Sequence, residues 1–193
     1  MRSFITALQF LTRIHLVKQE VLTAEDFGRS TRFFPLVGAV LGCLYLLAAL
    51  ACLALLGLPS YTAKAILVIL PIPVFVMPVI GRMAMLFAVA HFPYARPSGM
   101  GQAFAEAADR RAVVIGLVTS LVFVAPWGIA AIAALLAGQA FAFVFGRYAT
   151  AKLGGLTGDV YGAIELMTET LVLIIFFLFA VLPFDRTGCF LWM

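Results

Sequence analysis

Long apolar segments without charge dominate this sequence and limit the folds open to it. Residues 35–58 contain no charged side chain, and they suffice to cross the ~30 Å hydrocarbon core of a membrane. Residues 112–145 also lack charge, and Pro126 with Gly128 divides them into two helices. Only 11% of the 193 residues are charged, against about 25% in a soluble domain. The pattern predicts an all-α, polytopic helical membrane protein.

Two further apolar regions complete a predicted bundle of about five transmembrane helices. The region 65–92 carries Pro71, Pro73 and Pro78. Each proline removes a backbone donor, so a broken or kinked helix is expected in this region. The last span is expected at residues 160–182, directly after a glycine-rich stretch.

The N-terminal segment is predicted to form an amphipathic helix, because Phe4, Leu8 and Leu11 share one helical face. Such a helix lies either on the membrane surface or against the inner face of the protein itself. The chain is predicted to be a single integral membrane domain. Its expected parts are a cytoplasmic amphipathic segment at residues 1–33, a membrane bundle at residues 34–182 and a tail at residues 183–193.

The net charge of +4 is attributed to membrane-flanking loops rich in Lys and Arg, and not to nucleic-acid binding. Most of these basic residues fall before residue 35, in residues 93–111 and in residues 146–159. In a five-span bundle these three loops share one side of the membrane. The positive-inside rule then predicts a cytoplasmic N-terminus.

Three carboxylates occupy the edge and the interior of the last predicted span. Asp159 stands at its start, and Glu165 and Glu169 lie one turn apart on the same helix face. Charge inside a membrane is costly unless it meets protein, water or a cation. The two glutamates therefore need a divalent cation, an arginine such as Arg82 or Arg147, or a proton. Capping alone also accounts for Asp159, and a structural ion pair also accounts for the glutamates.

Two glycine-rich connections are predicted to meet on the cytoplasmic face. The first holds Tyr94, Arg96, Gly99 and Gly101, and it can bring backbone N–H groups and a guanidinium close to a phosphate. A plain interhelical loop is the simpler interpretation. The second connection, residues 154–159, has glycines that allow close approach of a ligand or of another backbone segment.

Several motifs occur in a fixed order along the chain. They are Ala7-Leu8-Gln9-Phe10-Leu11-Thr12-Arg13, Phe34-Pro35-Leu36-Val37-Gly38, Gly81-Arg82, Tyr94-Ala95-Arg96, and the stretch from Gly155 to Glu169. In this order they resemble the cobalamin synthase family, also called adenosylcobinamide-GDP ribazoletransferase. The most specific part is Thr157-Gly158-Asp159-Val160-Tyr161-Gly162-Ala163.

The resemblance implies an integral membrane enzyme of late cobalamin biosynthesis, in the bacterial cell (inner) membrane. It implies transfer of the activated GDP-cobinamide to α-ribazole or α-ribazole 5′-phosphate with release of GMP. The family uses a divalent cation, usually Mg²⁺, and a hard cation bound by carboxylates suits phosphate chemistry. Corrinoid nucleotide and α-ribazole are then the substrates and lipid is the surrounding partner. Assembly as a homo-oligomer or in a membrane biosynthetic complex is left open.

The resemblance also implies roles for individual residues. Catalytic roles fall to Asp159, Glu165 and Glu169, and the cation is expected on Asp159 and Glu165. Substrate binding is expected from Arg82, Tyr94, Arg96, Gly99, Gly101, Arg147, Gly155, Thr157 and Gly158.

The chain departs from the family's pattern at one place. The family carries the motif Asp-Gly-x-x-Asp-Thr-x-Asp-Gly and an Asp-Ser-Arg segment before the Gly-Arg element, whereas residues 27–105 here contain no Asp or Glu. Residues 70–78 directly join the two regions that flank this segment in the family. Because the resemblance places the principal metal ligands in the missing segment, the chain is either an active transferase or a relative without activity.

Two other functions are compatible with the sequence. A small ion-coupled transporter is suggested by the proline-rich span and by the pair Glu165 and Glu169, although five spans provide no matched halves. A non-catalytic membrane scaffold would keep the family's fold and partners.

Overall fold

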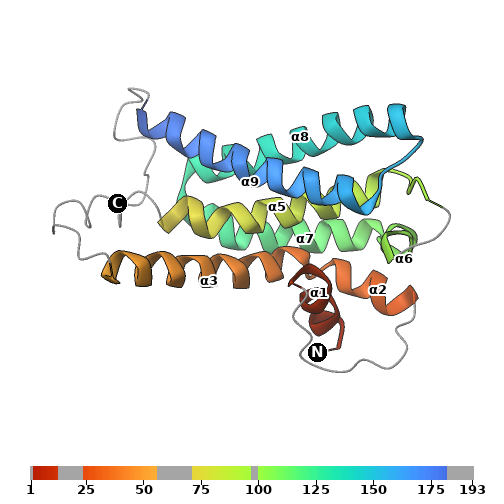
Figure 1. The fold of residues 1–193 in the computed structure, drawn as a ribbon, viewed down its shortest axis with the longest axis horizontal. Coiled ribbons are helices and arrows are strands. Elements are labelled where there is room, and N and C mark those ends of the chain that lie inside the picture. The colour runs from red at the N-terminus through yellow and green to blue at the C-terminus, as the bar shows by residue number, and fades with distance from the viewer. Residues whose placement is uncertain (1, 13–23, 56–70, 97–99, 182–193) are drawn as a thin grey trace.

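The structure, a computed structural model, describes residues 2–12, 24–55, 71–96 and 100–181. These residues form helices joined by short connections (Figure 1). The helices are α1 (Arg2–Thr12), α2 (Ala24–Thr31), α3 (Phe34–Leu55), α5 (Pro71–His91), α6 (Met100–Ala107), α7 (Arg110–Val124), the 3₁₀ helix η1 (Ala125–Trp127), α8 (Ile129–Leu153) and α9 (Gly158–Val181). The predicted all-α fold class is confirmed, while the predicted division into segments 1–33, 34–182 and 183–193 stays a prediction.

Five helices are long and apolar enough to cross a membrane, as the sequence predicted. They comprise α3, α5, α7 continued by η1, α8 and α9, and successive crossings run in opposite directions (Figure 1). The division of residues 112–145 is also confirmed: η1 and Gly128, whose φ is 85°, separate α7 from α8. The predicted tail lies outside the described residues.

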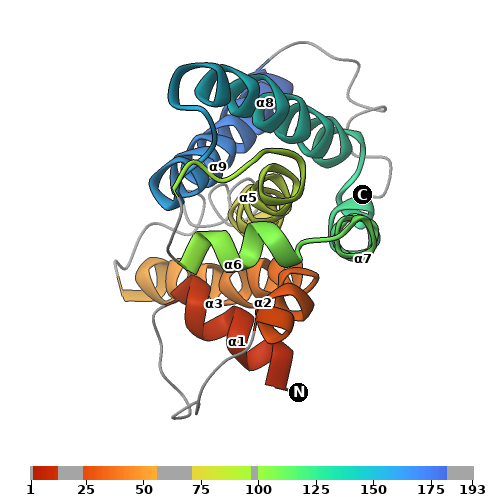
Figure 2. The same cartoon turned by 90° about the vertical axis from the view of Figure 1, so that its right-hand side faces the viewer.

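Helix α5 is the centre of the bundle. It packs against α3, α7, α8 and α9 (Figure 2), and most of its side chains are buried. No break interrupts it between Pro71 and His91, and residues 65–70 of the predicted region lie outside the described residues. Pro71 and Pro73 occupy the first turn, where a backbone N–H has no partner within the helix, so their missing donors cost little. Only Pro78 lies in the interior.

Two glycines of α3 allow it to approach α5 closely. A Cβ atom added at Gly38 would collide with the carbonyl of Pro78, and one added at Gly42 would collide with the carbonyl of Phe75. Small residues spaced four apart let two membrane helices meet backbone to backbone, where dispersion contacts are densest. This contact fixes the position of α3 beside the central helix.

One end of the bundle, here called the polar end, carries α2, α6, the connection at residues 92–96 and the connection at residues 154–157 (Figures 1 and 2). Basic residues of helix ends and connections gather there: Arg29, Arg32, Arg96, Arg110, Arg111 and Lys152. The two glycine-rich connections therefore share one face, as predicted.

Helix α1 packs against the protein itself at the polar end. It contacts α2 and α3, Ala7 is fully buried, and the Phe4 ring meets the Phe33 ring edge-on at 6.2 Å. Of the two placements predicted for the N-terminal helix, the structure has the one against the inner face of the protein.

Candidate functional site

A cavity of about 430 Å³, here called the site cavity, opens at the polar end. Helices α1, α3, α5, α6 and α9 and the connection at residues 92–96 all contribute to its wall. Its lining consists of Phe10, Leu11, Phe34, Met85, Val89, Tyr94, Arg96, Gly101, Phe104, Gly158, Asp159, Tyr161, Gly162 and Glu165. Segments distant in the sequence thus place acidic, basic and aromatic side chains around one space.

Two backbone hydrogen bonds hold the glycine-rich connections together beside the cavity. The Ala95 N–H donates to the Leu156 carbonyl and the Leu156 N–H donates to the Pro93 carbonyl, each at 2.8 Å. These bonds form an isolated parallel bridge between Tyr94 and Leu156. Gly155 permits the approach, because a Cβ atom there would lie 2.7 Å from the Pro93 oxygen. Among the glycines of this connection, Gly155 makes the close backbone contact, whereas Gly154 and Gly158 have open space around them.

Arg96 and Asp159 face each other at the mouth of the cavity. Arg96 Nη2 lies 3.9 Å from Asp159 Oδ2, and the two side chains are 62% and 92% exposed. An ion pair so open to solvent contributes little to stability, typically below about 1 kcal/mol. Both charged groups therefore remain available to an incoming ligand.

Deeper in the bundle, Arg82 of α5 lies between two carboxylates of α9. Its guanidinium Nη1 pairs with Glu165 and lies 3.8 Å from Glu169 Oε1. All three side chains are largely buried, and Glu165 also lines the cavity. Among the compensating groups considered for the two glutamates, the structure places an arginine, Arg82, beside them. A charge inside the membrane is tolerated when such a partner faces it from a neighbouring helix.

One wall of the cavity is aromatic, and sequence analysis did not assign it to the site. The Phe10 ring lies 4.1 Å from the Phe104 ring and 6.3 Å from the Phe34 ring. Phe10, Phe34 and Phe104 come from α1, α3 and α6, so no local pattern links them in the sequence. On the α9 side, the rings of Tyr94 and Tyr161 stack at 6.3 Å.

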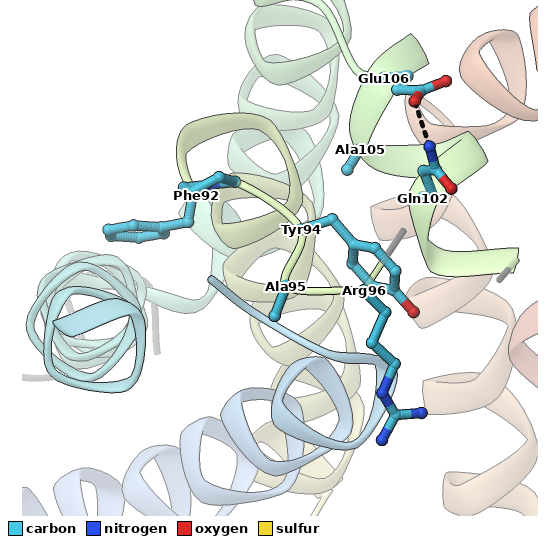
Figure 3. Close-up of a pocket in the computed structure, with 8 residues that line it drawn as sticks. Phe92, Tyr94, Ala95, Arg96, Gln102, Ala105 and Glu106 are labelled. Atoms are coloured by element: carbon cyan, nitrogen blue, oxygen red, sulfur yellow. Dashed lines mark hydrogen bonds between the residues drawn. The ribbon is translucent and has the colours of Figure 1, made fainter. Parts of the chain in front are cut away.

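A second hollow, of about 510 Å³, adjoins the site cavity and shares Tyr94 and Arg96 with it (Figure 3). Its other side is formed by α6, where the Gln102 amide donates to the Glu106 carboxylate at 2.7 Å. Figure 3 shows the Arg96 side chain extending away from these two α6 residues toward α9. Tyr94 and Arg96 thus stand between two spaces, an arrangement that suits a reaction between two ligands.

The structure brings most of the predicted site residues to this region. The site cavity is lined by six of them: Tyr94, Arg96, Gly101, Gly158, Asp159 and Glu165. Four others lie in the surrounding structure: Arg82 and Glu169 in the ion-pair group, Gly155 at the backbone bridge, and Thr157, whose Oγ1 accepts from the Val160 N–H at 3.4 Å.

One predicted residue is not brought into the site, and one cannot be placed. Arg147 is exposed on α8 and lines neither hollow. Gly99 lies outside the described residues.

The described residues hold no group of three or more His, Cys, Asp or Glu side chains that could by itself bind a metal ion. Asp159 and Glu165 are six residues apart on α9, so roughly 9 Å of helix axis separates their levels. Asp159 is open at the mouth, whereas Glu165 is engaged with Arg82. These donors fit Mg²⁺ bound through one carboxylate together with phosphate oxygens and water, as is usual for Mg²⁺ at phosphate sites.

The fold and the site define a multi-pass α-helical membrane protein with a polar, aromatic-walled ligand cavity at one end of its bundle. No solved structure matches it. The chain belongs to the cobalamin-5-phosphate synthase family, whose family model matches residues 3–74 and 70–177.

Relatives named adenosylcobinamide-GDP ribazoletransferase align with half or more of the chain. The protein from Desulfitobacterium hafniense is 28% identical over 245 residues, covering 90% of this chain and 96% of the relative. The protein from Pseudomonas aeruginosa is 28% identical over 241 residues, covering 90% and 97%. A Pseudomonas putida protein is 39% identical over 100 residues, covering 50% of this chain and 39% of the relative.

The family match is divided at the first turn of α5. Its two parts meet at residues 70–74, within the passage where an internal segment is predicted to be missing. The alignment with the Desulfitobacterium protein is also longer than the whole of this chain. The relative therefore has residues that find no counterpart here, as the predicted deletion requires.

Proposed function

We propose that this protein transfers the activated corrinoid of adenosylcobinamide-GDP to α-ribazole or α-ribazole 5′-phosphate and releases GMP. The observation that carries the proposal is the site cavity, where Arg96, Asp159 and Glu165 of the family-like motifs meet in one space. The relatives' name, ribazoletransferase, supplies the reaction. The corrinoid nucleotide and the ribazole are then its two substrates.

In this reaction an acceptor hydroxyl attacks the phosphorus linked to the corrinoid, and the bond from that phosphorus to GMP breaks. Arg96, at the border of the two hollows, is placed to bind oxygens of the pyrophosphate. A guanidinium neutralises charge on such oxygens and matches their geometry with two parallel hydrogen bonds. Glu165, on the cavity wall and beside Arg82, is placed to orient the attacking hydroxyl.

Mg²⁺ is the proposed cofactor, held by Asp159 together with substrate phosphate oxygens. When bound, the cation neutralises the pyrophosphate and makes GMP a better leaving group. Asp159 and Glu165 lie at different heights along α9. Glu165 is therefore a second ligand only when a phosphate oxygen or a water molecule bridges the distance between Glu165 and the cation.

We further place the protein in the bacterial inner membrane, with the N-terminus and the polar end in the cytoplasm. The basic residues at the polar end support this orientation, because cytoplasmic loops are rich in Lys and Arg. Exposed apolar residues along the crossing helices, such as Leu47, Leu136 and Phe177, suit contact with lipid, with a second copy or with a partner enzyme.

A GMP-release assay tests the function. The purified full-length protein, in detergent or nanodiscs, is mixed with adenosylcobinamide-GDP and α-ribazole, with Mg²⁺ or with EDTA. We expect release of GMP that requires both the protein and Mg²⁺. GMP formation at the rate of a protein-free blank would leave the family assignment in place and identify this chain as a non-catalytic scaffold. The family match does not favour a transporter.

A further inference from the structure

We infer that the aromatic wall of the site cavity binds the planar base of the acceptor nucleoside, and that the Tyr161 hydroxyl bonds to its sugar. The inference rests on the proposed function, which provides the two substrates. It assigns the site cavity to the acceptor and leaves the nucleotide of the donor to the adjoining hollow.

The aromatic wall offers a ring surface through Phe10, which is 36% exposed, whereas Phe34 and Phe104 are 0% and 1% exposed and pack against it. Phe10 and Phe34 lie with their ring planes only 16° apart, and Phe104 is tilted against both at 4.1 Å and 5.8 Å between centroids. Planar bases stack on such side chains, and the contact needs no hydrogen bond from the base. Leu11 and Met85 extend the same apolar surface.

The chemistry of this wall distinguishes between the bases that the reaction brings in. The base of ribazole is a benzimidazole, which presents a carbon edge to its surroundings. Guanine carries N–H and C=O groups on its edges, and these would lose their hydrogen bonds against phenylalanine rings. A volume of about 430 Å³ lies at the small end of the ~300–1,000 Å³ range of ligand pockets. It accommodates a nucleoside, whereas a corrin ring system is larger.

The opposite wall is suited to the sugar. Tyr161 is only 5% exposed, it lines the cavity, and its hydroxyl has no hydrogen-bond partner among the described residues. A buried hydroxyl without a partner is destabilising, and a ribose hydroxyl in the cavity would provide one. Glu165 lies one turn further along α9 and lines the same cavity. A base on Phe10 thus places its ribose between Tyr161, Glu165 and the mouth with Arg96.

Equilibrium binding to the purified full-length protein tests this assignment without requiring turnover. Isothermal titration calorimetry is performed with α-ribazole, with guanosine and with GMP, each in the absence of the donor. We expect α-ribazole to bind at least tenfold more tightly than guanosine, and free benzimidazole to compete with α-ribazole.

Three substitutions locate the binding site. Phe10→Ala should weaken α-ribazole binding roughly tenfold, the scale of one base–aromatic stack, and leave GMP binding unchanged. Phe104→Leu removes the ring that packs against Phe10 at 4.1 Å and should weaken α-ribazole binding in the same direction by displacing Phe10. Tyr161→Phe should weaken α-ribazole binding with no loss of thermal stability. The control Phe177→Ala alters a residue that is 66% exposed on α9, and it should change neither affinity.

The outcomes separate this inference from the proposed function. Selective α-ribazole binding that depends on Phe10 and Tyr161 supports the assignment even when no GMP is released. Absence of α-ribazole binding, equal binding of guanosine, or unchanged affinity in both Phe10→Ala and Tyr161→Phe overturns it. Because Phe10 is partly exposed, its variant remains informative if Phe104→Leu fails to fold.

Discussion

Arg82 of α5 pairs with Glu165 of α9, and the same guanidinium lies 3.8 Å from the carboxylate of Glu169 one turn further along. The central helix and the last helix are therefore joined by one cation between two anions. This arrangement explains how α9 carries two glutamates in a membrane-length segment. It also ties the wall of the site cavity to the centre of the bundle.

Arg82→Met should strongly destabilise the protein, by about 3–5 kcal/mol, because it leaves two largely buried carboxylates without a cation. Arg82→Met combined with Glu165→Met should regain part of this loss, since only Glu169 is then uncompensated. Thermal unfolding in detergent measures both. Arg147→Met, at an exposed arginine of α8, is the control and should change stability by less than about 0.5 kcal/mol. Unfolding of Arg82→Met at the wild-type temperature would contradict the proposed role of the pair.

The two glutamates should differ in their effect on activity. Glu165 lines the site cavity, whereas Glu169 is absent from its lining. Glu165→Gln should therefore lower kcat/KM for GMP release by roughly 10²-fold, the scale of a misplaced reacting group. Glu169→Gln should act mainly on stability, and His91→Gln, on an exposed residue, should act on neither. Equal losses of kcat/KM in Glu165→Gln and His91→Gln would remove Glu165 from the site.

Two aspartates at helix starts provide a matched comparison. Asp159 is exposed beside Arg96, whereas Asp109 caps α7 by accepting from the Ala112 N–H at 2.8 Å. Asp109→Ala should lower stability by about 1 kcal/mol and leave kcat/KM unchanged. Asp159→Ala should have the opposite profile, with near-normal unfolding and a large loss of Mg²⁺-dependent GMP release. Rescue of Asp159→Ala by higher Mg²⁺ concentration would support its role as a cation ligand. A loss of stability without loss of turnover would identify Asp159 as a cap alone.

Much of the fold was predictable because lipid imposes simple constraints. A crossing helix needs about 20 apolar residues, so long apolar runs were enough to predict the five crossings, and the basic residues predicted which loops share a face. The prediction of a broken or kinked helix over residues 65–92 is tested only from residue 71 onward, because residues 65–70 lie outside the described residues. With the helix beginning at Pro71, only Pro78 is an interior proline.

The candidate site was less predictable, because it depends on which helices are neighbours. The sequence offered Arg82 and Arg147 equally as partners for Glu165. Only the packing of α5 against α9 distinguishes them, since Arg82 pairs with Glu165 while Arg147 is exposed on α8. The aromatic wall was missed for the same reason. Phe10, Phe34 and Phe104 belong to three helices, and a phenylalanine in an apolar helix is ordinarily a packing residue.

The position of the divided family match has a topological consequence. Helix α3 ends and α5 begins at the end of the bundle opposite the polar end (Figure 1), and the match divides at the first turn of α5. An additional segment inserted there reaches the site cavity only by crossing the bundle and returning.

The bridge between Tyr94 and Leu156 leads to the last prediction. Gly155→Ala places a methyl group 2.7 Å from the Pro93 oxygen and 2.8 Å from the Ala95 nitrogen, so the two connections must separate. We expect this overpacking to lower the free energy of unfolding by about 1–3 kcal/mol and to reduce GMP release. Gly154→Ala is the matched control: Gly154 has a φ of 76° with open space around it, so it should cost only about 1 kcal/mol of backbone strain. Hydrogen exchange at the amides of Ala95 and Leu156 distinguishes the two variants, because both amides donate across the bridge at 2.8 Å. The exchange of both amides should accelerate in Gly155→Ala and stay slow in Gly154→Ala. Equal protection of the amides in both variants would show that the contact between the two connections does not require glycine at residue 155.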